Sequence, residues 1–85
     1  MTEGHQLEAL RGLLLRKRAS GQLPAFIGPR AWAGRGTTGA RCALCDSRIE
    51  YRDIEFEVEW QQGAEVQLLR FHDFCYRVWS GEFVL

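Results

Sequence analysis

The 85-residue sequence has no net charge, one methionine, two prolines and only three cysteines. Three cysteines cannot all pair within one chain, so the disulfide framework of many small secreted domains is not expected. Acidic and basic residues number 11 each, which gives no overall field to attract nucleic acid or a membrane surface. The longest aliphatic run, Leu13–Leu15, falls far short of the roughly 20 apolar residues that span a bilayer.

The length allows one small domain. Such a chain buries only about 60% of its unfolded surface, so its core needs help from a metal or a partner. The first residues, Met1 to Gln6, lack a basic region followed by an apolar stretch, which a secretory signal would have. We therefore expect a cytoplasmic protein with reduced thiols and no membrane association.

Charge is distributed unevenly along the chain. Residues 1–41 carry seven basic and two acidic side chains, whereas residues 42–85 carry four basic and nine acidic ones. Such an asymmetry divides the sequence into a basic arm and an acidic module. We expect three segments: a basic helix in 1–20, a connector in 21–40 and a metal-binding module in 41–85.

The first segment predicts an amphipathic helix over residues 6–19. Leu7, Leu10 and Leu14 share a face, with Leu13 beside them. Three basic residues in the last turn suit the helix dipole, and Ser20-Gly21 provides a stop. A helix of this length is marginal alone. We expect its leucines to dock on the sheet face that carries Leu69 and Phe71, or both surfaces to await a partner.

Glycine and proline dominate the connector and make regular structure there unexpected. Phe26, Ile27 and Trp32 are nevertheless too apolar for a purely flexible linker. Either Trp32 and Phe26 pin the connector onto the module, or the segment is a mostly disordered arm with incidental aromatics.

Residues 54–60 alternate strictly between apolar and acidic side chains, which predicts a strand. A turn at 61–64 and a second strand at 65–71 complete a β-hairpin, and residues 73–82 predict a short helix. The residues expected to face the core are Ile54, Phe56, Val58, Trp60, Val78 and Trp79. The residues expected to face outward are Glu55, Glu57 and Glu59.

All three cysteines and one histidine fall into one pattern. Cys42 and Cys45 form a pair, and after 26 residues His72 and Cys75 repeat its spacing. A C-x-x-C turn brings two sulfurs together, and a pair at i and i+3, where a strand enters a helix, faces one way. Three thiolates and one imidazole close a tetrahedral site. The pattern therefore predicts one structural Zn²⁺ bound by Cys42, Cys45, His72 and Cys75.

Two simpler interpretations of the cysteines exist. Cys42 and Cys45 could form a redox pair, although no thioredoxin-type pattern surrounds them. The thiols could also be buried as small apolar groups. Neither interpretation accounts for His72 and Cys75 repeating the spacing. The residue after the second cysteine of such a turn often has a positive φ, which Asp46 tolerates better than most residues.

The order of these elements predicts a small α+β zinc-binding domain of treble-clef type: a cysteine knuckle, a β-hairpin and a short helix. Residues 39–80, with Ile49 after the knuckle and Trp79 after the last ligand, resemble the zinc finger of poly(ADP-ribose) polymerases and some DNA ligases, and the first half of a LIM domain. The polymerase-type resemblance implies binding to DNA ends. The spacing between the pairs is slightly shorter here, the module is acidic where that finger is basic, and the second half of a LIM domain is lacking.

The whole chain most resembles small bacterial zinc-binding proteins of an uncharacterised family, which pair this site with a basic N-terminal helix and a connector rich in Trp and Gly. This resemblance implies no activity. A closed four-ligand site has no position for a reactive water, so we expect neither an enzyme nor a small-molecule substrate. We expect a zinc-stabilised protein-interaction module, an adaptor or regulator, whose partner has a basic surface or is a second copy.

The alternative function is nucleic-acid binding by the basic arm. Its arginines and Lys17 could follow a phosphate backbone while Trp32 stacks on a base. The acidic module argues against this alternative, because three thiolates, one imidazole and Zn²⁺ together add a further negative charge.

Overall fold

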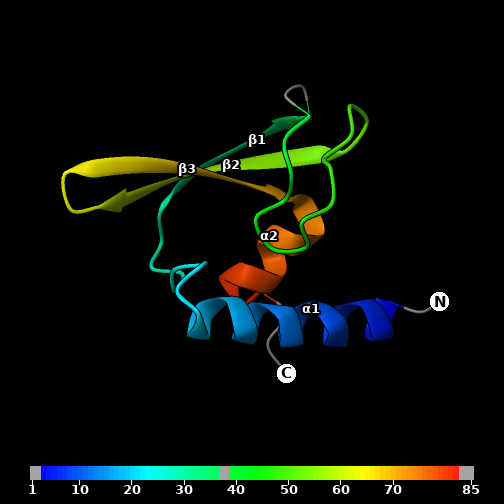
Figure 1. Ribbon diagram of the computed structural model, residues 1–85. Helices are drawn as coiled ribbons and strands as arrows, with labels where there is room; N and C mark the ends of the chain where they lie inside the picture. The colour runs from blue at the N-terminus through cyan, green and yellow to red at the C-terminus, as the bar shows by residue number, and fades with distance from the viewer. Residues whose placement is uncertain (1–2, 37–38, 83–85) are drawn as a thin grey trace.

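The computed structural model describes residues 3–36 and 39–82, in which two helices and three strands are present (Figure 1). In chain order they are α1 (Glu3–Ala19), β1 (Arg30–Arg35), β2 (Ile54–Gln62), β3 (Glu65–His72) and α2 (Asp73–Ser80). The strands form one antiparallel sheet in the order β1-β2-β3, so the fold is a small α+β fold. Figure 1 shows α2 lying between the sheet and α1, which gives three layers.

The predicted hairpin is present and its strands are longer than expected. β2 extends to Gln62, which pairs with Glu65 of β3, so the loop is Gly63-Ala64 rather than four residues. Gly63 has a φ of 64°, a conformation that glycine adopts without strain.

The sheet face that packs on α2 is called the inner face. Cross-strand partners share a face, so Phe56 and Phe71 lie on it together, as do Val58 and Leu69. Phe56 stacks on Tyr76 of α2 with ring centroids 4.2 Å apart, and Phe71 stacks on Trp79 at 4.9 Å. The predicted inward positions of Phe56 and Val58, and the burial of Val78 and Trp79, are therefore confirmed.

Two positions on β2 differ from the prediction. Glu55 was expected to face solvent, yet only 7% of it is exposed. Glu55 lies on the outer face of the sheet, which is the face away from α2. Arg70 of β3 provides a counter-charge there, with its Nε 2.9 Å from Glu55 Oε2. Ile54 was expected in the core, yet it is 53% exposed at the end of the strand.

The connector contains the strand β1, which the composition did not predict. All six residues of β1 pair with β2, from Arg30 opposite Glu59 to Arg35 opposite Ile54. Trp32 does not pin the connector, because it is 48% exposed on the outer face of the sheet, opposite α2.

Phe26 pins the connector onto α2. Its ring meets Trp79 edge-on at 5.1 Å, and Trp79 Nε1 donates a 2.8 Å hydrogen bond to the carbonyl oxygen of Pro24. Leu23 is buried in the same core. Of the two earlier interpretations, the pinned connector is the one observed, with Phe26 rather than Trp32 as the anchor.

The N-terminal helix is present and begins at Glu3, earlier than predicted. It docks through Leu10, which is buried, but it packs against α2 rather than against the sheet face that carries Leu69 and Phe71. α2 already covers that face. Leu15 is 66% exposed, so leucines are not confined to one side of α1. No helix among the described residues is long and apolar enough to cross a membrane.

Candidate metal centre

The first two candidate ligands lie on a tight turn, called here the knuckle (residues 41–48). An antiparallel bridge joins Arg41 to Arg48 at its base, and the Asp46 N–H donates to the carbonyl of Cys42 at 3.0 Å. Asp46 has a φ of 67°, the positive value expected at that position. Leu44 at the tip is fully buried, which anchors the turn in the core.

The other two candidate ligands lie where β3 becomes α2. His72 is the last residue of β3 and the N-cap of α2, with extended backbone angles, and Cys75 follows in the first turn. α2 ends at Ser80, two residues before the predicted end, and Gly81 caps it with a φ of 84°. The strand-to-helix junction therefore turns His72 and Cys75 toward the same point.

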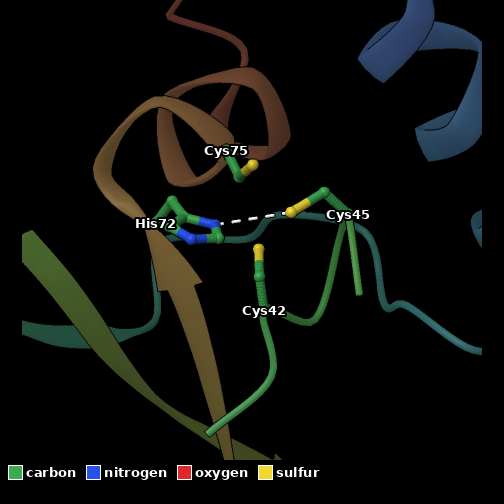
Figure 2. Close-up of side chains that lie close together, drawn as sticks. All are labelled: Cys42, Cys45, His72 and Cys75. Atoms are coloured by element: carbon green, nitrogen blue, oxygen red, sulfur yellow. Dashed lines mark hydrogen bonds between the residues drawn. The ribbon is translucent and has the colours of Figure 1, made fainter. Parts of the chain in front are cut away.

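The structure brings all four predicted ligands together. Their donor atoms, three Sγ and one imidazole nitrogen, all lie within 4.8 Å of one another. Figure 2 shows the sulfurs of Cys42 and Cys45 approaching from the knuckle while His72 and Cys75 approach from the opposite side. His72 Nδ1 is 3.4 Å from Cys45 Sγ. The four side chains could therefore hold one metal ion.

The three thiols differ in pKa because they share hydrogen bonds. Hydrogen bonds from Cys42 and Cys75 hold the pKa of Cys45 far below its usual range. Hydrogen bonding with Cys45 raises the pKa of Cys42, and hydrogen bonding with Cys42 and Cys45 raises the pKa of Cys75. Hydrogen bonds within the cluster thus favour the thiolate form of Cys45. A cation would offset the charge of further thiolates, so metal and protons compete for the site.

Backbone and carboxylate groups orient the histidine. His72 Nε2 lies 3.2 Å from the carbonyl oxygen of Arg48 and 3.6 Å from Asp53 Oδ2. A proton on Nε2 donated to that carbonyl leaves Nδ1 free to bind a metal. Asp53 is held in turn by the Glu50 N–H, which donates to its Oδ2 at 2.8 Å. Sequence reasoning missed both supporting groups, and the Arg48 carbonyl has no signal in a sequence.

Ala43 joins the knuckle to both β3 and α1. The Ala43 N–H donates to the carbonyl of Arg70 on β3 at 2.7 Å, and Lys17 of α1 donates to the carbonyl of Ala43 at 2.9 Å. A cleft of about 370 Å³ between α1 and the site is lined in part by Gln6, Leu10 and Cys45. The metal centre thus lies between the knuckle, β3 and α2, with this cleft separating part of it from α1.

In comparisons with known proteins, no protein-family model, no curated protein and no solved structure matches this chain.

Proposed function

We propose that Cys42, Cys45, His72 and Cys75 bind one Zn²⁺ with a structural role. Three sulfurs and one imidazole nitrogen are a donor set that zinc favours, and four protein ligands leave no position for a reactive water. The three cysteines are free of disulfides, which leaves every thiol available to the metal. In this proposal the metal ties the knuckle to the β3–α2 junction in a treble-clef arrangement.

The proposed function of the whole chain is that of a zinc-stabilised protein-interaction module, not an enzyme. The observation that carries it is the outer face of the sheet, where large apolar side chains stay exposed. These residues, called the outer-face patch, are Trp32 (48% exposed), Leu68 (49%) and Val66 (55%). Exposed apolar side chains that share one face of a sheet are typical of a protein-binding surface.

The row of glutamates between these apolar residues is less available to a basic partner than the sequence indicates. Arg70 binds both Glu55 and Glu57, at 2.9 and 2.7 Å, and Arg30 lies 3.9 Å from Glu59. The proposed partner is therefore another protein that binds the apolar side chains of the outer-face patch. We propose that the two proteins interact in the cytoplasm, where thiols stay reduced.

Nucleic-acid binding by the basic arm is the weaker alternative. Lys17 is buried against Asp46 and so is not free to contact a phosphate. Titrating salt against a fluorescent oligonucleotide tests this alternative, since phosphate contacts give a steep loss of affinity with salt. Tight, strongly salt-dependent binding would favour it over the protein-interaction module.

Crosslinking of the intact, zinc-loaded chain to partners in cell lysate tests the proposed function. We expect a specific partner that is lost when Trp32→Ser and Leu68→Ser are combined. The matched control combines Leu15→Ser and Ile27→Ser, which changes two side chains that are 66% and 74% exposed elsewhere. Retention of the partner by the control and its loss from the outer-face variant support the proposal. Equal behaviour of both variants, or no specific partner, contradicts it.

A further inference from the structure

One edge of the sheet is open for backbone pairing. β1 pairs with β2 on one side only, and no described segment pairs with its other side. The ladder continues past β1, where the Gly36 N–H donates to the Asp53 carbonyl at 3.1 Å. Residues of an antiparallel pair alternate between those bonded to the partner and those facing away. Counting back from Gly36, the backbone groups of Ala31, Ala33 and Arg35 point to the open edge.

A positively charged cleft adjoins this edge. It measures about 510 Å³ and lies where β1 ends beside the segment that leads into β2. Its lining residues are Ala33, Gly34, Arg35, Arg52, Asp53 and Ile54. Arg35 and Arg52 are exposed, and neither forms an ion pair with a described residue.

The remaining groups of the cleft leave the two arginines available and add an apolar surface. The carboxylate of Asp53 already accepts the Glu50 N–H and lies near His72. Arg35 lies over the ring of Tyr51, 5.8 Å from its centroid, an arrangement that orients the guanidinium without neutralising its charge. Ile54, 53% exposed, contributes apolar surface.

We propose that an extended acidic segment of a partner protein adds to β1 as a fourth strand. Its backbone bonds to Ala31, Ala33 and Arg35, its carboxylates lie at Arg35 and Arg52, and an apolar side chain covers Ile54. Strand addition of this kind takes affinity from backbone hydrogen bonds and specificity from alternate side chains. The inference rests on the proposed function and adds the chemistry of one segment of the partner, which binds at the β1 edge beside Trp32 of the outer-face patch.

Other occupants fit the edge less well. A second copy that pairs all six residues of β1 antiparallel places Arg30 opposite Arg35 at both ends, and like charges directly opposite are destabilising. A nucleic acid has no peptide groups to complete the ladder.

Nuclear magnetic resonance of the full, zinc-loaded chain tests the inference with a defined probe. The probe is a capped decapeptide of alternating Glu and Val, and the control replaces Glu with Lys. At about 1 mM or below, the acidic peptide should shift the amides of Ala31, Ala33 and Arg35 and slow their hydrogen exchange about tenfold. The Lys peptide should leave them unchanged. No shift on β1 with the acidic peptide, or equal shifts with both peptides, overturns the inference.

Charge variants separate local contacts from overall charge. Arg35→Gln combined with Arg52→Gln should weaken the acidic peptide about fivefold to tenfold, as expected for two exposed charge pairs. Arg16→Gln combined with Arg18→Gln changes the net charge equally at exposed sites on α1 and should leave the affinity unchanged. Equal weakening by both combinations would mean that net charge alone attracts the peptide, which overturns the inference.

A backbone variant tests strand addition itself. Ala33→Pro removes an N–H on the open edge without removing a ladder bond to β2, a position where a sheet tolerates proline. We expect this variant to lose peptide binding while its NMR spectrum stays dispersed, as that of a folded chain is. Undiminished binding overturns strand addition.

A final arm separates this inference from the proposed function. A twelve-residue oligothymidylate that shifts the same amides and displaces the peptide would overturn the inference in favour of nucleic acid. A crosslinked partner that depends on the outer-face patch, with β1 amides unmoved by the acidic peptide, would refute strand addition and leave the interaction module standing.

Discussion

Lys17 Nζ lies 2.8 Å from Asp46 Oδ1, which joins the last turn of α1 to the residue that follows Cys45. The same ammonium donates to the carbonyl of Ala43 at 2.9 Å, and the Lys17 side chain is only 10% exposed. Asp46 can occupy its positive φ with little strain and has its carboxylate free for this pair. The docking of α1 and the shape of the knuckle are therefore linked through one ammonium group.

Replacing Lys17 with Met should loosen α1 while keeping the apolar stem in place. The lost contacts include a hydrogen bond between charged groups, so we expect the free energy of unfolding to fall by about 1–3 kcal/mol. Chemical denaturation of the zinc-loaded chain measures this. Arg18→Met, at an exposed neighbouring site, should change stability by less than about 0.5 kcal/mol. Equal effects of the two substitutions would contradict the link.

A double-mutant cycle measures the Lys17–Asp46 pair itself. Asp46→Asn removes the charge and keeps a residue that tolerates positive φ. We expect the effects of Lys17→Met and Asp46→Asn to be non-additive, with a coupling of at least about 0.5 kcal/mol. Amide exchange of residues 7–16 should quicken in both single variants. Additive effects would show that the pair contributes nothing measurable.

Arg70→Met should be among the most destabilising substitutions on the sheet. It leaves the buried carboxylate of Glu55 without its counter-charge, and breaking a buried pair in this way costs about 3–5 kcal/mol. Adding Glu55→Gln to that variant should recover part of the loss. Thermal unfolding of the single and double variants compares them. If Arg70→Met alone left the thermal stability unchanged, the counter-charge of Arg70 would not be required to bury Glu55.

Phe26 and Ile27 are adjacent in the connector but differ in burial. Phe26→Ala removes the ring that packs on Trp79, and for a half-buried aromatic we expect a loss of about 2 kcal/mol. Ile27→Ala, at a side chain that is 74% exposed, should change stability by less than about 0.5 kcal/mol. Urea titration of both variants tests the contrast. Equal losses would mean that Phe26 does not anchor the connector.

Metal removal should unfold the region around the knuckle and α2. Structural zinc in finger peptides contributes about 10–16 kcal/mol of apparent binding free energy, which exceeds the stability of a small domain. A chelator should therefore expose Trp79, now 4% exposed, and shift its fluorescence to longer wavelength. Adding zinc back should reverse the shift. An unchanged spectrum after complete metal removal would contradict a structural metal.

The parts of the fold that depend on local pattern could be predicted from the sequence. Alternation along residues 54–60 indicated β2, and the repeated ligand spacing indicated which four side chains meet. Asp46 was expected to adopt a positive φ because it follows the second cysteine of the turn, and it has a φ of 67°.

The missed features depend on contacts between distant segments. β1 is short and contains Gly34, so its pairing with β2 outweighs a local composition that disfavours a strand. Glu55 is buried beside Arg70 of the neighbouring strand, and the alternation along β2 does not show which of its glutamates has such a partner. α1 was expected on the sheet because the position of α2 over Phe71 could not be deduced from periodicity.

X-ray absorption at the zinc edge tests the central claim most directly. For zinc-loaded protein with one metal per chain, we predict three sulfur ligands at about 2.3 Å and one nitrogen ligand at about 2.0–2.1 Å. Cys75→Ser should reduce the sulfur count to two or abolish binding. A wild-type spectrum with fewer than three sulfurs, or with a water oxygen in place of the imidazole, would contradict a closed site formed by Cys42, Cys45, His72 and Cys75.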